Sequence, residues 1–339
     1  MAAKRVAAFG EVMMRLQVPG YDLLAQADTL KYSFSGTGVN VVSALARFGH
    51  EGRLVTTLPD NPLGDAALAA LRRLGISDSF IRRDGRLIGM YFLENGFGAR
   101  ASRVTYADRL SSSFNTAPDG AYDYEAIARE VDFMHFCGIT FAMNDGVREH
   151  AKKLARAVKA NGGTVAFDCN YRPSLWGEDG YAKAKPHYIE MLRLADIVFM
   201  NEKDAIGILG MQSEHEGRRE RLTDLIPQVA REYGISVVAG THRSINGDNT
   251  HSLTGYIFAE GMFAFSGQLT FSVYDRIGAG DAFASGIAHG VLEGWEPSPT
   301  VRFASAAAML AHTVAGDTPM SSAAEIMRAM TDAPGDVER

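Results

Sequence analysis

Short apolar runs alternate with amphipathic stretches over most of the chain. The runs Val131–Phe136, Thr164–Asp168, Asp196–Met200 and Ile235–Ala239 have the length of buried strands. The segments between them carry apolar residues at helical spacing. They predict helices at Val147–Ala160, Tyr181–Leu194, Glu202–Leu209 and Arg218–Tyr233. This alternation predicts a doubly wound α/β fold whose mostly parallel sheet has helices on both faces.

The first third of the chain follows a different pattern. Arg5–Gly10 is a short apolar run closed by glycine and predicts the first strand of the main sheet. Residues of about 11–36 and 86–110 alternate loosely, with aromatic and β-branched residues placed between glycines. We predict that these two segments form a small β-sheet lid on a single domain that spans residues 1–339.

Composition narrows the class of protein. The chain has 339 residues and is 46% hydrophobic, which is enough for one large domain with a sizeable core. Its net charge of −6 and the lack of a basic block argue against nucleic acid as a partner. The apolar runs are too short for a membrane span, and no signal peptide is expected at the start. Cys137 and Cys169 lie in apolar runs without metal-site spacing, so a reduced, cytoplasmic protein is predicted.

The most informative stretch is Val273–Gly286. Gly278-Ala279-Gly280 turns into a predicted helix with Phe283 and Ile287 on one apolar face. A glycine-rich turn and a first helical turn together present unpaired N–H groups and partial positive charge, which suits a phosphate group. Asp281, in that first turn, could accept a proton from a hydroxyl group while the N–H groups hold the phosphoryl group in transfer. The short motif alone also fits an ordinary turn with an acidic residue at a helix start.

This stretch also carries a family resemblance. Asp275-x-x-Gly278-Ala279-Gly280-Asp281-Ala282-Phe283 resembles the C-terminal signature of the ribokinase (PfkB) carbohydrate kinases. The resemblance extends over nearly the whole chain. It implies a ribokinase-like fold and ATP-dependent phosphorylation of a sugar hydroxyl with Mg²⁺. It also implies that Asp281 is the catalytic base and that Gly278, Ala279 and Gly280 form the anion hole.

A second glycine motif lies at residues 35–40. Gly36-x-Gly38 is not a dinucleotide fingerprint, because it lies far beyond the first strand and has Val41 at the sixth position. Ser35-Gly36 stands where the family has a Gly-Gly hinge, and Asn40 matches its sugar-binding asparagine. The resemblance therefore places Gly36 and Asn40 at the sugar. From the residues alone, Asn40 could instead cap the helix.

A further signal follows the predicted strand that ends at Asp168. Asn170-Tyr171-Arg172-x-x-Leu175-Trp176 resembles the 2-keto-3-deoxygluconate kinases within the family, as does Phe136–Thr140. A guanidinium group is well shaped to hold the carboxylate of a sugar acid. The side chains expected around the sugar are Arg172, Arg109, Tyr91 and Tyr106. The alternative is that Arg172 pairs with a structural aspartate and that the tyrosines only pack the lid.

The metal is expected near Asn201-Glu202-Lys203-Asp204, which follows another predicted strand. Amide and carboxylate oxygens suit Mg²⁺ held through its water shell. The resemblance assigns Asn201 and Asp204 to Mg²⁺ and phosphate, with Asp204 in place of the family's glutamate and Glu202 as an added carboxylate. An acid-rich helix start would also be explained by the helix dipole alone.

Residues 239–249 occupy the place of the family's nucleotide loop but do not match its Lys-x-Gly-x-x-Gly pattern. The resemblance still places the nucleotide near Asn201, Gly278 and Gly280. Thr241 and Arg243 are further candidates for contact with its phosphates. His242 and His251 are predicted to be surface residues.

The substrate that the resemblance implies is 2-keto-3-deoxygluconate (2-dehydro-3-deoxy-D-gluconate), which would be converted to its 6-phosphate. A kinase of the same fold for a neutral sugar or a nucleoside is one alternative, and a non-catalytic sensor of sugar or nucleotide is another. An exposed lid edge indicates a homodimer formed through the lid. The sequence leaves open whether a monovalent cation is needed.

Overall fold

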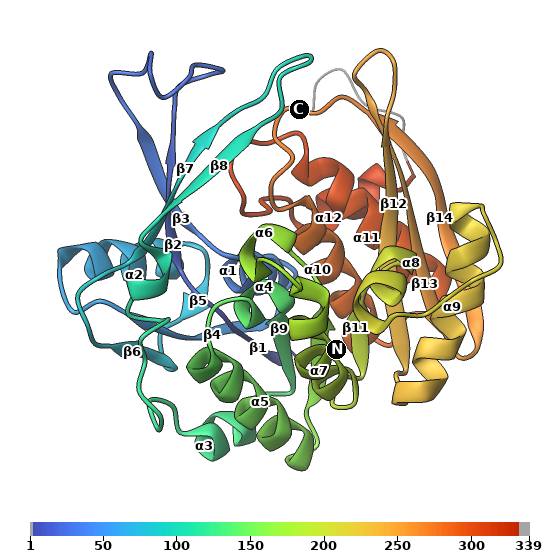
Figure 1. The fold of residues 1–339 in the computed structure, drawn as a ribbon, viewed down its shortest axis with the longest axis horizontal. Coiled ribbons are helices and arrows are strands. Elements are labelled where there is room, and N and C mark those ends of the chain that lie inside the picture. The colour runs from blue at the N-terminus through green and yellow to red at the C-terminus, as the bar shows by residue number, and fades with distance from the viewer. Residues whose placement is uncertain (1–2, 332–339) are drawn as a thin grey trace.

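The computed structural model describes residues 3–331, which fold into a large sheet, a smaller sheet and flanking helices (Figure 1). The strands are β1 (Arg5–Phe9), β2 (Met13–Gln17), β3 (Lys31–Ser35), β4 (Glu51–Leu58), β5 (Ile76–Ser77), β6 (Ile81–Arg83), β7 (Gly89–Glu94), β8 (Arg103–Ala107), β9 (Phe133–Cys137), β10 (Thr164–Asp168), β11 (Ile197–Phe199), β12 (Val237–Ile245), β13 (His251–Ala259) and β14 (Met262–Phe271).

The helices alternate with these strands along the chain. They are α1 (Thr37–Arg47), α2 (Pro62–Arg73), α3 (Tyr124–Arg129), α4 (Gly138–Phe141), α5 (Asp145–Ala160), α6 (Pro173–Trp176), α7 (Gly180–Leu192), α8 (Glu202–Asp204), α9 (Arg218–Tyr233), α10 (Ala279–Leu292), α11 (Pro297–Ala311) and α12 (Ala323–Ala329). Two short turns, η1 (Arg109–Ser111) and η2 (Ala205–Leu209), complete the set.

The large sheet has ten strands, nine of them in the order β14-β13-β12-β11-β10-β9-β1-β4-β5, while β6 pairs with β4. Strands β12, β11, β10, β9, β1 and β4 run parallel, as the sequence pattern predicts. Strand β1 pairs with β4 on one side and with β9 on its other side, so the order of strands changes direction at β1. Ligands of such sheets bind at the carboxyl ends of the strands beside this change of direction.

Helices cover both faces of the large sheet, in line with the predicted doubly wound fold. One core cluster joins the sheet to α3, α5, α7 and α9, and a second joins its other face to α1, α10 and α11. Helix α10 is buried on all sides from Ala279 to Gly290, apart from Gly280. It is not a surface helix with a single apolar face, because α11 packs closely against it, with Gly286 facing Ala304.

Within residues 239–249, the predicted polar turn at Asn246–Asn249 is present, but residues 239–245 form a strand and not a loop. Strand β12 continues to Ile245 and pairs antiparallel with β13, which in turn pairs antiparallel with β14. The prediction was wrong here because polar residues on an edge hairpin give no continuous apolar run, while nine pairs of residues between β12 and β13 satisfy the backbone.

The smaller sheet, with the order β3-β2-β7-β8, rises beside the open end of the large sheet (Figure 1). Its outer strands, β3 and β8, are the two edges of this sheet, and Tyr32 and Val104 on them are exposed. Dimerisation through this sheet stays a prediction. Among the described residues, no helix combines the length and the apolar character needed to cross a bilayer.

Candidate active site

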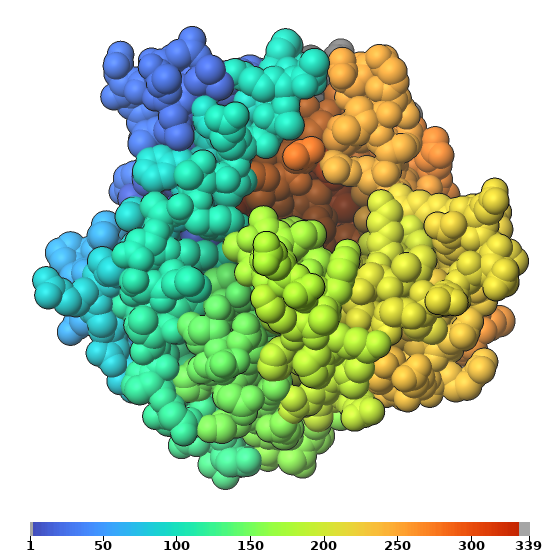
Figure 2. Space-filling view, viewed as in Figure 1, coloured from blue at the N-terminus to red at the C-terminus, as the bar shows by residue number. Residues whose placement is uncertain are grey.

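A cleft of about 890 Å³ opens between the smaller sheet and the carboxyl ends of the parallel strands. Figure 2 shows this hollow, with the lid strands on one side and the β12–β14 region on the other. The residues that the sequence singled out for sugar, nucleotide or metal line it, apart from Glu202. They are Gly36, Asn40, Tyr91, Tyr106, Arg109, Arg172, Asn201, Asp204, Thr241, Arg243, Gly278, Ala279, Gly280 and Asp281. The functional roles of these residues stay predictions.

The floor of the cleft is the turn that begins α10. Gly278 is the residue before the helix and has a φ of 86°, a left-handed conformation that glycine adopts at little cost. A Cβ atom at this position would lie 1.7 Å from the carbonyl oxygen of Asp317, so no larger residue fits. The first N–H groups of α10, which have no partner within a helix, therefore begin at the cleft.

Asp281 lies in the first turn of α10 and is only 7% exposed. The side-chain amide of Asn40 donates a hydrogen bond to its Oδ2 atom at 2.7 Å. Asn40 lies inside α1 rather than at its cap, because α1 begins at Thr37 with Gly36 as the preceding residue. The helix-cap interpretation of Asn40 is therefore wrong. The bond fixes one carboxylate oxygen, and within residues 3–331 no group hydrogen-bonds to the other.

Gly36 is required for close packing. Its backbone is extended, with a φ of 161°, so no left-handed strain demands glycine. An added Cβ atom would instead lie 2.2 Å from the carbonyl oxygen of Glu11. The chain between β3 and α1 thus passes directly against the segment that follows β1.

Three aspartates gather at the cleft, and each has a raised pKa. Burial, together with the nearby charge of Asp281, raises the pKa of Asp168 to about 7. Burial also raises the pKa of Asp204 and of Asp281 to about 6. Arg172 opposes the shift in all three. Buried carboxylates that lack enough positive charge make a favourable place for a cation.

Asn201 and Asp204 form a capping box at the start of α8. The Asn201 side chain accepts from the N–H of Lys203 at 2.8 Å, and Asp204 accepts from the N–H of Asn201 at 2.8 Å. Glu202 does not line the cleft and pairs with Arg218 at 2.5 Å and with His242 at 2.9 Å. Its prediction as an added carboxylate of the metal site is therefore wrong, since these partners neutralise it.

Arg172 is exposed at the rim of the cleft, just before α6. Within residues 3–331, its guanidinium group makes no hydrogen bond or ion pair, so it is open to an incoming anion. Arg109 differs, because its Nε atom donates to Glu11 at 2.6 Å and its guanidinium lies over the Tyr106 ring. Its Nη1 atom is buried without a partner in that part of the chain.

A buried ion network next to the cleft is absent from the sequence predictions. Arg15, on β2, is 1% exposed and pairs with Asp275 at 2.9 Å and with Asp317. Asp317 also accepts hydrogen bonds from Ser35 and Tyr91, which belong to the smaller sheet. Through this network the smaller sheet is bound to Asp275 and Asp317, which lie in the two loops next to Gly278. Asp275 was visible in the motif, but no sequence signal indicates Arg15 or Asp317.

Thr241 and Arg243 lie on β12, on the side of the cleft opposite the smaller sheet. The Nη1 atom of Arg243 lies 3.2 Å from Nδ1 of His251. His251 is 7% exposed, so its prediction as a surface residue is wrong. It lies on β13 between β12 and β14, and the His312 ring is 6.1 Å away.

A doubly wound sheet, a lid and a buried carboxylate beside a glycine turn at a helix start define a phosphotransferase that acts on small molecules. Comparison with known families agrees. The family described as pfkB family carbohydrate kinase matches residues 3–242 and 250–324. The chain therefore belongs to the pfkB family of carbohydrate kinases and is an enzyme of that class. Membership of a kinase family implies ATP and Mg²⁺.

Individual relatives cover nearly the whole chain. A candidate 2-keto-3-deoxygluconate kinase from Enterococcus faecalis is 38% identical, with a TM-score of 0.95 over 99% of both chains. The 2-dehydro-3-deoxygluconokinase of Thermotoga maritima is 33% identical, with a TM-score of 0.92 over 97% of this chain and 100% of its own. The 2-dehydro-3-deoxygalactonokinase of Haloferax volcanii is 26% identical over 98% of each chain.

Proposed function

We propose that the protein phosphorylates 2-keto-3-deoxygluconate at its 6-hydroxyl group, using ATP. The observation that carries the proposal is Arg172, a guanidinium without an ion partner in the described chain, at the rim of the cleft that contains Asp281. The substrate is a sugar acid, so its carboxylate supplies the missing partner of Arg172. The names of the relatives support the same class of substrate.

In the proposed reaction, the free oxygen of Asp281 accepts the proton of the sugar hydroxyl. The sugar oxygen then bonds to the γ-phosphorus of ATP, and the bond from that phosphorus to the ADP oxygen breaks. The N–H groups of Ala279 and Gly280 stabilise the charge on the phosphoryl group in transfer. Asn40 holds Asp281 in the orientation that this transfer needs.

The residues at the cleft fit a magnesium ion. Asp168, Asp204 and Asn201 offer oxygen ligands, and the raised pKa values of both aspartates reflect negative charge that lacks a cation. Since Asn201 and Asp204 already cap α8, we propose that they hold Mg²⁺ through water. When bound, Mg²⁺ would neutralise charge on the phosphate oxygens. Thr241 and Arg243 are proposed to contact the nucleotide.

Replacing Arg172 by glutamine is expected to raise KM for 2-keto-3-deoxygluconate about 10- to 100-fold, with a much smaller change in kcat. A charge-assisted hydrogen bond is worth about 1.5–3 kcal/mol, and it acts on the bound substrate as much as on the transition state. Steady-state kinetics with 2-keto-3-deoxygluconate, its galactonate epimer and fructose checks this.

The matched control for Arg172 is Arg73→Gln, which removes an exposed arginine at the end of α2 without touching the cleft. It should leave KM unchanged for every sugar. An Arg172→Gln variant with wild-type KM for the acid would remove the carboxylate role, as would equal turnover of fructose by the wild-type enzyme. Binding of ATP without turnover of any sugar would favour a sensor instead.

Activity is expected to fall on the acid side of about pH 6. Burial raises the pKa of Asp281 to about 6, and the base accepts a proton only when it is ionised. Below this pKa the ionised fraction, and with it kcat/KM, should fall by about tenfold per pH unit. A pH profile of kcat/KM at saturating Mg²⁺ checks this. A profile that stays level from pH 7 down to pH 5 would contradict the assignment of Asp281 as base.

A further inference from the structure

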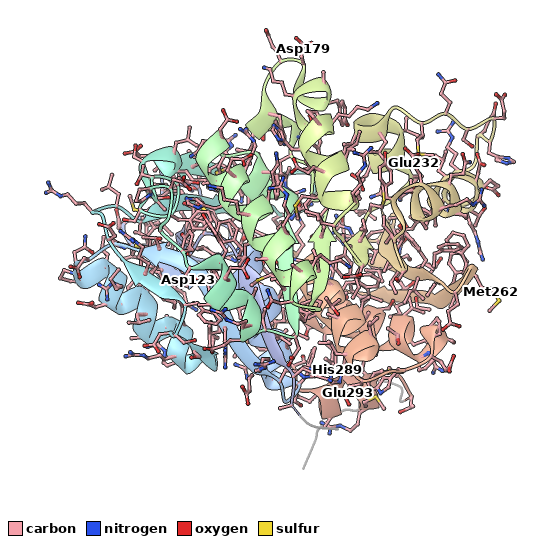
Figure 3. All side chains as sticks on the ribbon, turned by 90° about the horizontal axis from the view of Figure 1, so that it is seen from below. Asp123, Asp179, Glu232, Met262, His289 and Glu293 are labelled. Carbon is pink, nitrogen blue, oxygen red and sulfur yellow. The ribbon has the colours of Figure 1, made fainter. Side chains whose placement is uncertain are left out.

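A cluster of potential metal ligands lies away from the cleft. His289 and Glu293 are on α10, and His50 lies in the turn between α1 and β4. Figure 3 labels His289 and Glu293 side by side. Asp281 lies in the first turn of the same helix, and Glu293 follows its last residue. The site at the cleft uses none of these three side chains.

We propose that His50, His289 and Glu293 bind a divalent transition-metal ion of the zinc class, with a water molecule as the fourth ligand. One ligand atom from each residue already lies within 4.8 Å of the others. Two imidazoles and one carboxylate, with an open fourth position, are a donor set that zinc accepts. Mg²⁺ and Ca²⁺ prefer sites made of oxygen alone.

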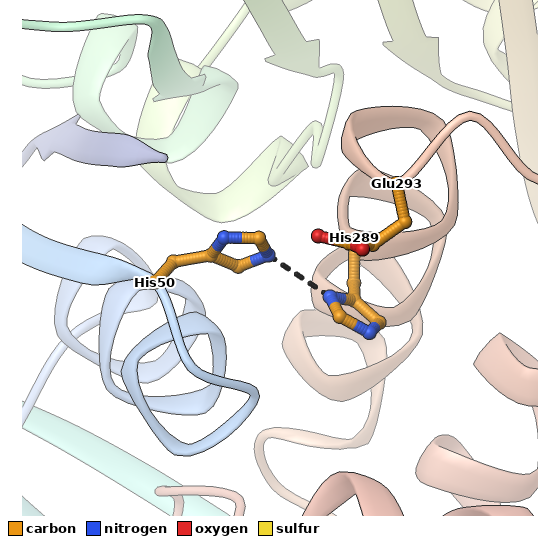
Figure 4. A group of neighbouring side chains, drawn as sticks. All are labelled: His50, His289 and Glu293. Atoms are coloured by element: carbon orange, nitrogen blue, oxygen red, sulfur yellow. Dashed lines mark hydrogen bonds between the residues drawn. The ribbon is translucent and has the colours of Figure 1, made fainter. Parts of the chain in front are cut away.

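The two histidine rings already face each other. Nε2 of His50 and Nδ1 of His289 are 2.9 Å apart (Figure 4). Two nitrogens bound to one tetrahedral zinc at about 2.0–2.1 Å lie about 3.3 Å apart. The rings therefore need to separate by only about 0.4 Å to admit the ion between them.

Glu293 completes the set from the same face of α10 as His289. Residues four apart on a helix are neighbours, so both side chains can reach one ion. Glu293 is half-buried, and its carboxylate makes no hydrogen bond or ion pair within residues 3–331. It can therefore swing towards the histidines without breaking another contact. The C-terminal end of a helix also carries partial negative charge, which favours a cation.

The protein environment holds the histidines neutral and fixed. His50 is 7% exposed and His289 is 6% exposed, and rings of Phe48, Trp295 and Phe303 surround His289. Burial lowers the pKa of both histidines, that of His289 to about 4, so each keeps a free lone pair at neutral pH.

Metal binding requires the ring proton of His50 to change its position. The N–H of Lys4 lies 3.4 Å from Nδ1 of His50, which leaves the ring proton on Nε2, pointing at His289. When the metal binds, this proton moves from Nε2 to Nδ1 of His50, and no net proton is released. The contact to Lys4 is long, so its loss costs little. The positive charge of Lys4 opposes the ion, and the carboxylate of Glu293 offsets it.

Zinc binding to the full-length protein tests the proposal. The protein is freed of metal with a chelator and titrated with Zn²⁺ in a calorimeter, with excess Mg²⁺ present to fill the oxygen-rich cleft. We expect one ion per chain. Glu293→Gln and His50→Gln should each weaken binding more than about tenfold, since even the loss of a ligand's hydrogen-bond partner costs 10- to 100-fold. The exposed His215 supplies the control variant His215→Gln, which should bind like the wild type.

A second measurement guards against variants that fail to fold. Co²⁺ should give the visible absorption of a tetrahedral ion in the wild type and in His215→Gln, but not in Glu293→Gln. Glu293 is half-buried and has no side-chain partner among the described residues, so its variant should keep the wild-type circular dichroism and kinase turnover. The proposal is overturned if Zn²⁺ does not bind in excess Mg²⁺. It is also overturned if Glu293→Gln, with intact circular dichroism, binds Zn²⁺ as tightly as the wild type.

Discussion

Replacing Asp281 by asparagine is expected to lower kcat by about 10²- to 10⁴-fold while sugar and ATP still bind. Asparagine has the same shape and can still accept the hydrogen bond from Asn40. It cannot take up the hydroxyl proton, because an amide oxygen is a very weak base. The loss should therefore appear in the chemical step and leave the geometry of the α10 turn intact. Single-turnover kinetics, together with calorimetric binding of sugar and ATP, separates these effects.

Asp179→Asn is the matched control for this change. Asp179 is exposed, does not line the cleft and has a φ of 55°, which asparagine tolerates. Its variant should turn over like the wild type. If Asp281→Asn kept turnover within a few fold of the wild type, the base would have to be another group, and Asp168 would be the next to replace.

Replacing Arg15 by methionine is expected to lower the free energy of unfolding by about 3–5 kcal/mol. Arg15 is the one cationic partner of Asp275 and Asp317 among the described residues, and all three side chains are at most 6% exposed. Methionine fills similar space but leaves two buried carboxylates without a counter-charge. Urea unfolding monitored by circular dichroism measures the loss as a shift of the midpoint at constant slope.

Arg5→Met provides the comparison, because it removes the same kind of ion pair from the surface. Arg5 pairs with Asp132 at 2.7 Å, and the two side chains are 39% and 35% exposed. Solvent screening should limit its effect to about 1 kcal/mol or less. Similar losses from both variants would mean that burial of the Arg15 network adds nothing to stability.

The parallel sheet and its helices could be predicted because each segment shows the hydrophobic pattern of the element that it forms. Runs such as Thr164–Asp168 are short and have an apolar centre, and the amphipathic segments between them are long enough to be helices. The β12–β14 hairpins were not predicted, since their edge position leaves polar residues on the strands. Their stability comes from pairing with neighbouring strands, which a local window of sequence does not contain.

Residues of the cleft could be predicted where a short stretch of sequence around them identifies their role. The glycine turn and Asp281 form one contiguous motif, and Arg172 follows a strand directly. The hydrogen bond from Asn40 to Asp281 was not predicted, because the two residues are 241 positions apart along the chain. Arg15 was not predicted, since an arginine in a short alternating strand is normally expected to face solvent. Only the tertiary fold brings the two aspartates to it.

The order of synthesis determines when the Arg15 ion network can form. Asp317 leaves the ribosome 302 positions after Arg15. Domains assemble from the N-terminal side while synthesis continues, so the early strands must wait for a late counter-charge. A nascent chain that stops before residue 317 lacks one of the two acids that brace the glycine turn.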